Sequence, residues 1–183
     1  MAVLPDAAAR PRRDIMRFVQ EARITASLEH PNIVPVHDIG VDSSGAPYFT
    51  MKLLRGETLA SVLEKLDSGV PEYVEAYNLT RLLRIFLKIC YAVAFAHSRG
   101  VLHLDLKPEN VQIGDFGEVL IMDWGLARVI KNGSADSESD SRTESGEELE
   151  NESRDIPSGA FATVDGVMKG TPGYMAPEQA AGK

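Results

Sequence analysis

The chain contains very little cysteine. Cys90 is the only cysteine among 183 residues, which excludes an intramolecular disulfide and a metal site built from several thiolates. It lies in residues 77–97, where apolar residues recur at the spacing of a helix, so we predict a long helix there. We expect one face of this helix to pack in the protein core. The side chains of that face are Leu79, Leu83, Phe86, Cys90, Val93 and His97.

Long apolar runs are also absent. No stretch approaches the roughly 20 consecutive apolar residues that cross a bilayer, and the first residues lack the charged and apolar regions of a signal peptide. We therefore predict no membrane segment in this chain and a cytoplasmic location. The hydrophobic fraction of 44% is sufficient for a packed core.

Positive charge is in short supply. Lys and Arg number 19 against 27 Asp and Glu, which gives a net charge of −8. The excess is concentrated between Gly133 and Asp155, a serine-rich stretch with few apolar residues that we expect to be disordered. Two interpretations remain open for it, a solvated spacer or a regulatory tract that is autophosphorylated. Its acidity argues against a nucleic-acid partner.

The most informative motif is the run HLDLKPEN, which is followed by DWG eighteen residues after its aspartate. Transfer of a γ-phosphoryl group needs a carboxylate that accepts the proton of the attacking hydroxyl, a cation, and oxygen ligands for Mg²⁺. Asp105 supplies the carboxylate and Lys107 the cation. Asn110 and Asp123 supply the oxygen ligands. The spacing thus indicates a phosphoryl-transfer site.

A second acidic triplet, Asp115-Phe116-Gly117, competes with Asp123 for the metal-binding role. The apolar run at 119–122 ends at Asp123, as a buried strand should. Asp115 lies between Gly114 and Gly117, which are turn residues. We therefore predict a hairpin over residues 111–122 with its turn at 114–117, and we assign the metal-binding role to Asp123.

Together with Ala176-Pro177-Glu178, these motifs resemble, in their required order, the catalytic domain of a bacterial Hanks-type serine/threonine protein kinase. The resemblance covers nearly the whole chain. It implies an α+β, two-lobe fold that is truncated at both ends, with a partial small lobe of antiparallel strands and a helix C, and a partial, mainly helical large lobe. The expected divisions are a small lobe and hinge at 1–55, a large lobe with catalytic and metal loops at 56–132, the acidic insert at 133–169, and the start of a substrate platform at 170–183.

The resemblance also implies roles for residues outside the two loops. Thr171 would bridge Asp105 and Lys107, and together with Lys107 it points to serine or threonine of a protein substrate. ATP and Mg²⁺ would be the cofactors. Residues implied to contact ATP or to position it are Glu21, as the helix-C glutamate, Met51, as the gatekeeper, Lys52 and Leu54, in the hinge, and Asp123.

The small-lobe elements follow from shorter patterns. Residues 17–28 predict an amphipathic helix. Residues 33–39 and 48–54 predict two strands, and the sequence Asp-Ser-Ser-Gly at 42–45 predicts the turn between them.

Several departures from the family pattern bear on activity. Leu104 stands where many such kinases carry an arginine that pairs with an activation-segment phosphate, so we expect phosphorylation at Ser158 or Thr163 to switch activity little. No lysine precedes Glu21, and Ala2 stands near the position of the ATP-binding strand lysine. Loss of a cation about 4 Å from the phosphates removes up to roughly 4 kcal/mol.

The family's glycine-rich loop and the later helices of its large lobe are likewise not in the sequence. We expect poor stability and an exposed apolar surface. Two hypotheses therefore stand. The chain is a fragment of an active Ser/Thr kinase, or it is an inactive kinase-like binding module or decayed gene fragment.

Overall fold

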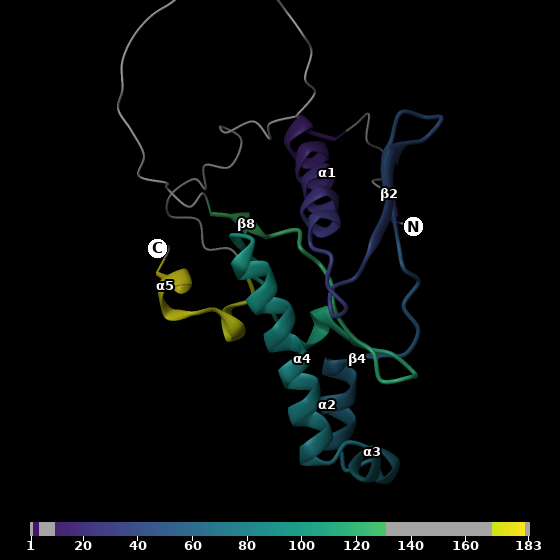
Figure 1. Ribbon diagram of the computed structural model, residues 1–183, viewed down its shortest axis with the longest axis vertical. Helices are drawn as coiled ribbons and strands as arrows, with labels where there is room; N and C mark the ends of the chain where they lie inside the picture. Colours follow the sequence, from purple (N-terminus) through teal and green to yellow (C-terminus); the bar gives the residue numbers. More distant parts are fainter. Residues whose placement is uncertain (1, 4–9, 131–169, 182–183) are drawn as a thin grey trace, which may run out of the picture.

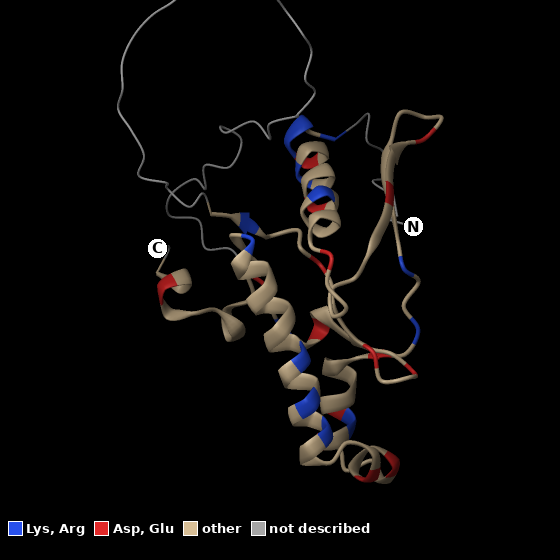
Figure 2. Cartoon of the chain, viewed as in Figure 1, with Lys and Arg blue, Asp and Glu red and all other residues tan. Residues whose placement is uncertain are grey.

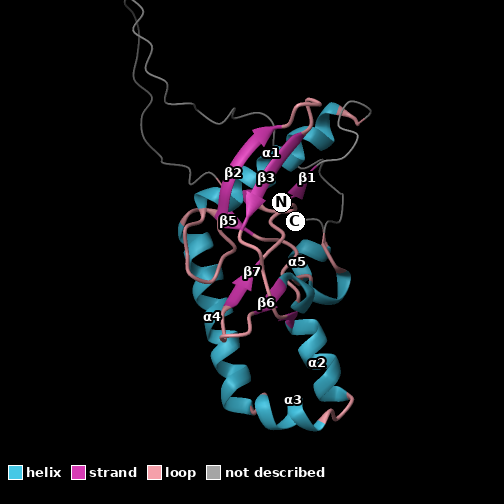
Figure 3. Cartoon of the chain, turned by 90° about the vertical axis from the view of Figure 1, so that its right-hand side faces the viewer, coloured by secondary structure: helices cyan, strands magenta, loops and turns pink. Residues whose placement is uncertain are grey.

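The computed structural model describes residues 2–3, 10–130 and 170–181, and these residues form two lobes (Figure 1). The upper lobe is an antiparallel sheet of strand order β1-β3-β2, made of β1 (Ala2–Val3), β3 (Pro47–Met51) and β2 (Val36–Val41). Helix α1 (Arg12–Ser27) lies beside this sheet (Figure 3). Phe18 of α1 packs on Phe49 of β3, with ring centroids 5.0 Å apart.

Helix α1 is longer than its apolar pattern indicates. It begins directly after Pro11, whose carbonyl accepts a hydrogen bond from Asp14 N at 2.9 Å. Asp14 in the first turn also suits the positive end of the helix dipole. The helix ends at Ser27, close to the predicted end, and it buries Ala22, Ile24 and Thr25. The pattern finds the buried part of the helix, and its solvated first turn carries no apolar signal.

Both predicted strands of this lobe need corrected limits. Ile33 forms only an isolated parallel bridge with Ile121, and β2 begins at Val36 because Pro35 has no N–H to donate to a neighbouring strand. Strand β3 stops at Met51, although Lys52 N still reaches Pro35 O at 3.1 Å. The turn at 42–45 is confirmed, since the Asp42 carboxylate accepts from Ser44 N and Ala46 N at 2.8 and 3.0 Å.

The lower lobe is mainly helical. It contains α2 (Leu59–Asp67), α3 (Pro71–Ala76) and α4 (Leu79–Ser98) around a small sheet of order β4-β6-β7. Thr58 Oγ1 accepts from Ser61 N to begin α2, and Asn78 Oδ1 accepts from Arg81 N to begin α4. The remaining short elements are β4 (Glu57–Thr58), β5 (Val101–Leu102), η2 (Pro108–Asn110), β6 (Val111–Ile113), β7 (Val119–Ile121), β8 (Arg128–Val129), η3 (Pro172–Tyr174) and α5 (Pro177–Ala180).

The predicted core face of α4 is wrong by one residue. The buried residues are Ile85, Ile89, Ala92 and Ala96. The predicted positions lie about 100° further round the helix, where Leu79 is 71% exposed, Phe86 is 60% exposed and Cys90 is exposed. His97 is exposed as well. Both faces are apolar, so periodicity alone cannot select the one that packs. The expected exposed apolar surface is confirmed along Leu79, Leu83, Phe86, Leu87 and Tyr91.

The core joins the two lobes. Leu28 and Ile33, which follow α1, are buried with Val62 of α2, Ile121 of β7 and Trp124. The segment after α1 is also tied to β7 through its backbone, because Ile121 N donates to Asn32 O and Val34 N to Ile121 O, at 2.9 and 3.1 Å. Among the described residues no helix is both long and apolar enough to span a bilayer.

Candidate functional site

The hairpin of β6 and β7 places residues 123–125, the predicted metal loop, beside residues 103–110, the predicted catalytic loop. Its strands pair antiparallel with Val111 opposite Ile121 and Ile113 opposite Val119. Beyond the pairing, Met122 N donates to Asn110 O at 2.9 Å. Asp123 therefore follows directly from a strand that ends at the catalytic loop.

Asp115 lies at the other end of the hairpin, as predicted. Gly117 N donates to Gly114 O at 3.0 Å, which closes the turn, and Gly114 N donates to Glu118 O at 2.9 Å. Asp115 is exposed, and the neighbouring Phe116 is 95% exposed. The position confirms that Asp115-Phe116-Gly117 belongs to the hairpin turn. The metal-binding role of Asp123 stays a prediction.

Two polar side chains meet at Asp105, one from the neighbouring Lys107 and one from Thr171, 66 residues further along the chain. Thr171 donates to Asp105 Oδ1 from both its hydroxyl, at 2.7 Å, and its backbone N, at 2.8 Å. Lys107 Nζ lies 3.0 Å from Asp105 Oδ2 and donates to Thr171 Oγ1 at 2.8 Å. The three groups form a closed triangle in which both carboxylate oxygens are engaged.

This triangle sets the charge state of its members. Burial raises the pKa of Asp105, but the hydrogen bonds from Thr171 and Lys107 outweigh it and leave the pKa below its ordinary value. The hydrogen bond to Asp105 raises the pKa of Lys107. Near neutral pH the site therefore holds an ionised carboxylate beside an ammonium group, which favours acceptance of a hydrogen bond from an incoming hydroxyl.

Thr171 reaches Asp105 because the segment from Gly170 is fixed against Leu104. Leu104 has a positive φ of 64°, and its carbonyl accepts from Gln179 Nε2 at 2.6 Å. Gly170 has φ of 117°, and a Cβ at this position would lie 2.6 Å from Leu104 O. Only glycine allows this approach without displacement of the backbone.

His103 is a structural support beneath the metal loop. It is 5% exposed, and its ring lies 4.6 Å from that of Trp124. Nδ1 accepts from Asp105 N at 3.3 Å, so Nε2 carries the proton that it donates to Met122 O at 3.0 Å. Burial lowers the pKa of His103, which keeps the imidazole neutral. The Nε2 bond ties the catalytic loop to Met122, the residue after β7, and the Nδ1 bond braces the loop at Asp105.

Asn110 and Asp123 present oxygen atoms suited to Mg²⁺. Asn110 is 7% exposed and donates from Nδ2 to Asp105 O at 2.9 Å, which leaves its Oδ1 as an acceptor. Asp123 is exposed and has φ of 58°. No group of three or more His, Cys, Asp or Glu side chains within the described ranges lies in an arrangement for a metal ion. Mg²⁺ needs only one or two protein carboxylates when phosphate oxygens complete its shell, so the donor set fits.

Helix α1 contacts the metal loop through two residues one turn apart. Arg17 Nε donates to Gly125 O at 3.0 Å. The Glu21 carboxylate lies against Gly125. A Cβ added to this glycine would be 2.9 Å from Glu21 Oε2. Burial and the charge of Asp123 raise the pKa of Glu21, and Arg17 only partly opposes them. The structure therefore brings Glu21 close to Asp123 and Gly125, into an environment that disfavours its charge.

The predicted hinge follows β3 on the far side of the site. Met51 is the last residue of the strand and is half-buried. Lys52 lies 3.9 Å from Glu118, an ion pair that connects the hinge to the hairpin. Leu54 is half-buried, whereas Leu53, which lies between Lys52 and Leu54, is 80% exposed. The backbone N–H of Lys52 already donates to Pro35 O, so it is not available to adenine. Adenine would have to bond to backbone groups after Lys52.

Two contacts in this region could not be predicted from the sequence. Arg17 lies within the predicted helix, but nothing in the pattern shows that it reaches Gly125. Gln179 follows the Ala-Pro-Glu motif directly, and only the folded chain shows its contact with Leu104. Both contacts join residues 75 or more positions apart.

The predicted acidic insert at 133–169 and its phosphorylation sites lie outside the described residues.

Comparison with known proteins assigns the family. The protein kinase domain matches residues 4–183. The chain belongs to the protein kinase family. The two-lobe kinase fold of the resemblance is thus confirmed.

Related kinases share much of the sequence. Serine/threonine-protein kinase PknD of Protochlamydia amoebophila is 41% identical over 172 residues, 91% of this chain and 16% of the relative. PknD of Chlamydia caviae is 42% identical over 171 residues, 91% of this chain and 17% of the relative. The chain thus spans about a sixth of the length of these curated relatives. The crystal structure of the yeast RNA Pol II CTD kinase CTDK-1 complex has the same fold, with a TM-score of 0.56 and 22% identity over 72% of this chain and 39% of that chain.

Proposed function

We propose that this chain is part of a serine/threonine protein kinase that transfers the γ-phosphoryl group of ATP, with Mg²⁺, to a protein. The triangle of Asp105, Lys107 and Thr171 carries the proposal. It supplies an ionised carboxylate with a cation 3.0 Å away, held by a hydroxyl 66 residues further along the chain. A cytoplasmic location, where ATP is available, belongs to the same proposal.

In this mechanism each side chain has a separate task. Asp105 Oδ1 accepts from two donors of Thr171 and Oδ2 faces only Lys107, so Oδ2 keeps more acceptor capacity to orient the substrate hydroxyl and receive its proton. Lys107 stabilises negative charge on the transferred group. Asn110 and Asp123 would hold Mg²⁺, which supplies further charge neutralisation on the phosphates when it is bound. His103 and Thr171 hold the catalytic loop in place.

A second function is supported by the small lobe. Ala2, near the position of the strand lysine, pairs with Phe49 in the sheet. Glu21 lies near Asp123, and the charge of Arg17 only partly offsets the repulsion. Such a site could bind a nucleotide or a protein without transfer of phosphate. This would be a kinase-like binding module.

One experiment separates the two functions. The chain and its Asp105→Asn variant are incubated with Mg²⁺, radiolabelled ATP and a serine- and threonine-containing protein, and labelled phosphoamino acids are identified. We expect phosphoserine or phosphothreonine with the unchanged chain and a loss of about a hundredfold or more with Asp105→Asn. Nucleotide binding without any transfer by the unchanged chain would support the binding module instead.

A further inference from the structure

A groove lies at the end of the hairpin that points away from the catalytic loop. It has a volume of about 480 Å³ and is lined by α4, by Ile113 of β6 and by residues 115–117 of the turn. The strands of the hairpin are three residues long, which separates the turn from Asn110 and Asp123 by about 10 Å. The groove is therefore distinct from the site that would hold ATP.

Three cations of α4 line this groove. Arg81, Arg84 and Lys88 are spaced by three and four residues, which places them on one face of the helix. Figure 2 shows blue Lys and Arg positions along the lower half of α4, beside α2 and α3. Within the lining they face a single carboxylate, that of Asp115, so the groove has a local excess of positive charge although the whole chain is acidic.

Two of these cations are held in place before any ligand binds. Arg81 donates to Ala76 O at 3.0 Å, and its guanidinium carbon lies 4.0 Å from the ring centre of Tyr77. Lys88 Nζ donates to Gly117 O at 2.8 Å. Each contact uses one of several N–H donors, and the others stay available. Arg84 makes no hydrogen bond or ion pair with the described part of the chain. Fixed cations lose less conformational entropy when they bind an anion.

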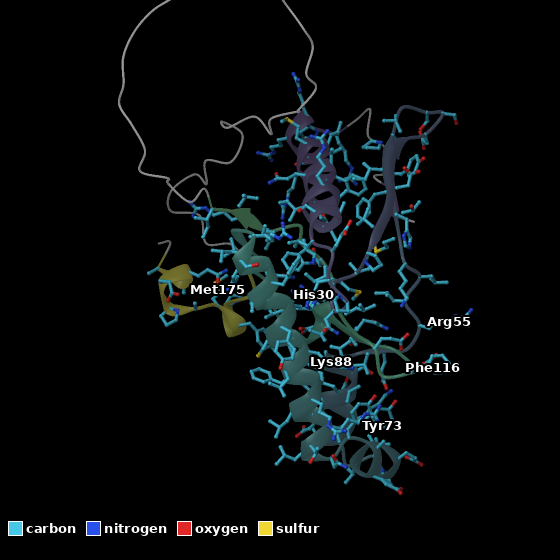
Figure 4. The ribbon with its side chains drawn as sticks, in the orientation of Figure 1. His30, Arg55, Tyr73, Lys88, Phe116 and Met175 are labelled. Carbon is cyan, nitrogen blue, oxygen red and sulfur yellow. The ribbon has the colours of Figure 1, made fainter. Side chains whose placement is uncertain are left out.

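An aromatic ring completes the groove. Phe116 also lines it and is 95% exposed. Figure 4 shows Phe116 at the outer tip of the hairpin and Lys88 on α4. Arginine and aromatic side chains are the residues most enriched among those that dominate protein interfaces.

We propose that this groove docks an acidic, extended segment of a partner protein, in which carboxylates pair with Arg81, Arg84 and Lys88 and an apolar side chain packs on Phe116. Charge complementarity selects the segment, and the fixed guanidinium and ammonium groups set its register. Docking here would leave the catalytic loop open, so it would raise the local concentration of a bound protein at that loop.

The test measures binding of a short fluorescein-labelled peptide of glutamates interrupted by leucine, by fluorescence anisotropy. We expect Arg84→Gln and Lys88→Gln each to weaken binding about threefold and the double variant about tenfold. Added salt should weaken binding further, because the contacts are between exposed charges. Arg13→Gln is the matched control, since it removes the same charge from α1, where the Arg13 side chain is 87% exposed. It should leave binding unchanged.

Changes to the peptide and to Phe116 separate specific docking from nonspecific adsorption. Replacement of glutamate by glutamine in the peptide should abolish binding, and Phe116→Ala should weaken it about threefold without disturbance of the core. Far-ultraviolet circular dichroism establishes that each variant is folded. Equal losses with Arg13→Gln and Arg84→Gln would overturn the proposal, as would a labelled oligothymidylate that binds as tightly as the acidic peptide. The assay contains no ATP, so its result is independent of whether the chain transfers phosphate.

Discussion

The contact between Arg17 and Gly125 should hold the metal loop against helix α1. Arg17 Nε is the donor at 3.0 Å, and the same guanidinium lies close enough to Glu21 to oppose the rise in its pKa. A hydrogen bond from a charged group contributes about 1.5 to 3 kcal/mol when it is buried. Arg17 is exposed, so solvent reduces this, and we expect Arg17→Met to cost about 1 kcal/mol.

Trp124 provides a direct measurement. It is the only tryptophan of the chain, it belongs to the metal loop, and it is 1% exposed. Unfolding in urea can therefore be followed by its fluorescence without interference from a second tryptophan. With a urea dependence of about 2 kcal/mol per M, a loss of about 1 kcal/mol lowers the midpoint by about 0.5 M. Quenching by acrylamide in the absence of urea should rise in the same variant.

Two further variants make this prediction specific. Arg17→Lys keeps a positive charge near Glu21 but loses the planar fork, so we expect about half of the destabilisation. Arg13→Met removes an arginine whose ion-pair contact is the adjacent Asp14, at 3.5 Å, and should leave the midpoint unchanged. The reasoning is refuted if Arg17→Met and Arg13→Met shift the midpoint equally, or if Trp124 is no more accessible to acrylamide in Arg17→Met.

Three other predictions follow from the site and from α4. The pKa of Glu21 is raised in the folded chain, so the stability that its protonated form contributes is present in acid and lost as pH rises through the folded-state pKa. Glu21→Gln should therefore unfold at higher urea than the unchanged chain at pH 7, with the difference closing below about pH 4; a lower midpoint at pH 7 would contradict this. Thr171→Val removes the hydroxyl from Asp105, so phosphoryl transfer in the radiolabel assay should fall about tenfold or more, whereas Thr171→Ser should keep most of it; equal rates for the two variants would show that the hydroxyl has no role. Cys90 is exposed, so a thiol reagent should label the native chain nearly as fast as the urea-unfolded chain, and strong protection would mean that this face of α4 is covered.

The candidate catalytic residues could be predicted from the sequence because their spacing is local. Asp105, Lys107 and Asn110 lie within six residues, and the hairpin that returns the chain to Asp123 is short. Turn-forming glycines mark the position of its turn. The sequence was therefore enough to predict that Asp115 lies in the hairpin turn and that the hairpin returns the chain to the side of Asn110.

Hydrophobic periodicity predicted the helices less accurately than the motifs predicted the position of the hairpin. It detected α1 and α4, but it missed the solvated first turn of α1 and chose the wrong face of α4, where Ile85 rather than Phe86 is buried. A helix that is apolar on two sides gives the same period for either face. The choice depends on which side meets β7, and this is a property of the folded chain.

The sequence alone determined the chemical groups of the site and the hairpin that joins them, because those depend on residue type and short spacing. The tertiary structure decided which of these groups meet. It placed Thr171 on Asp105 across 66 residues and Arg17 on Gly125 across 108. It also set the unfavourable charge of Glu21 beside Asp123 and gathered the cations of α4 at the hairpin turn. Each of these depends on the packing of distant segments, since hydrogen bonds and charges act over a few ångströms in space whatever their separation in sequence.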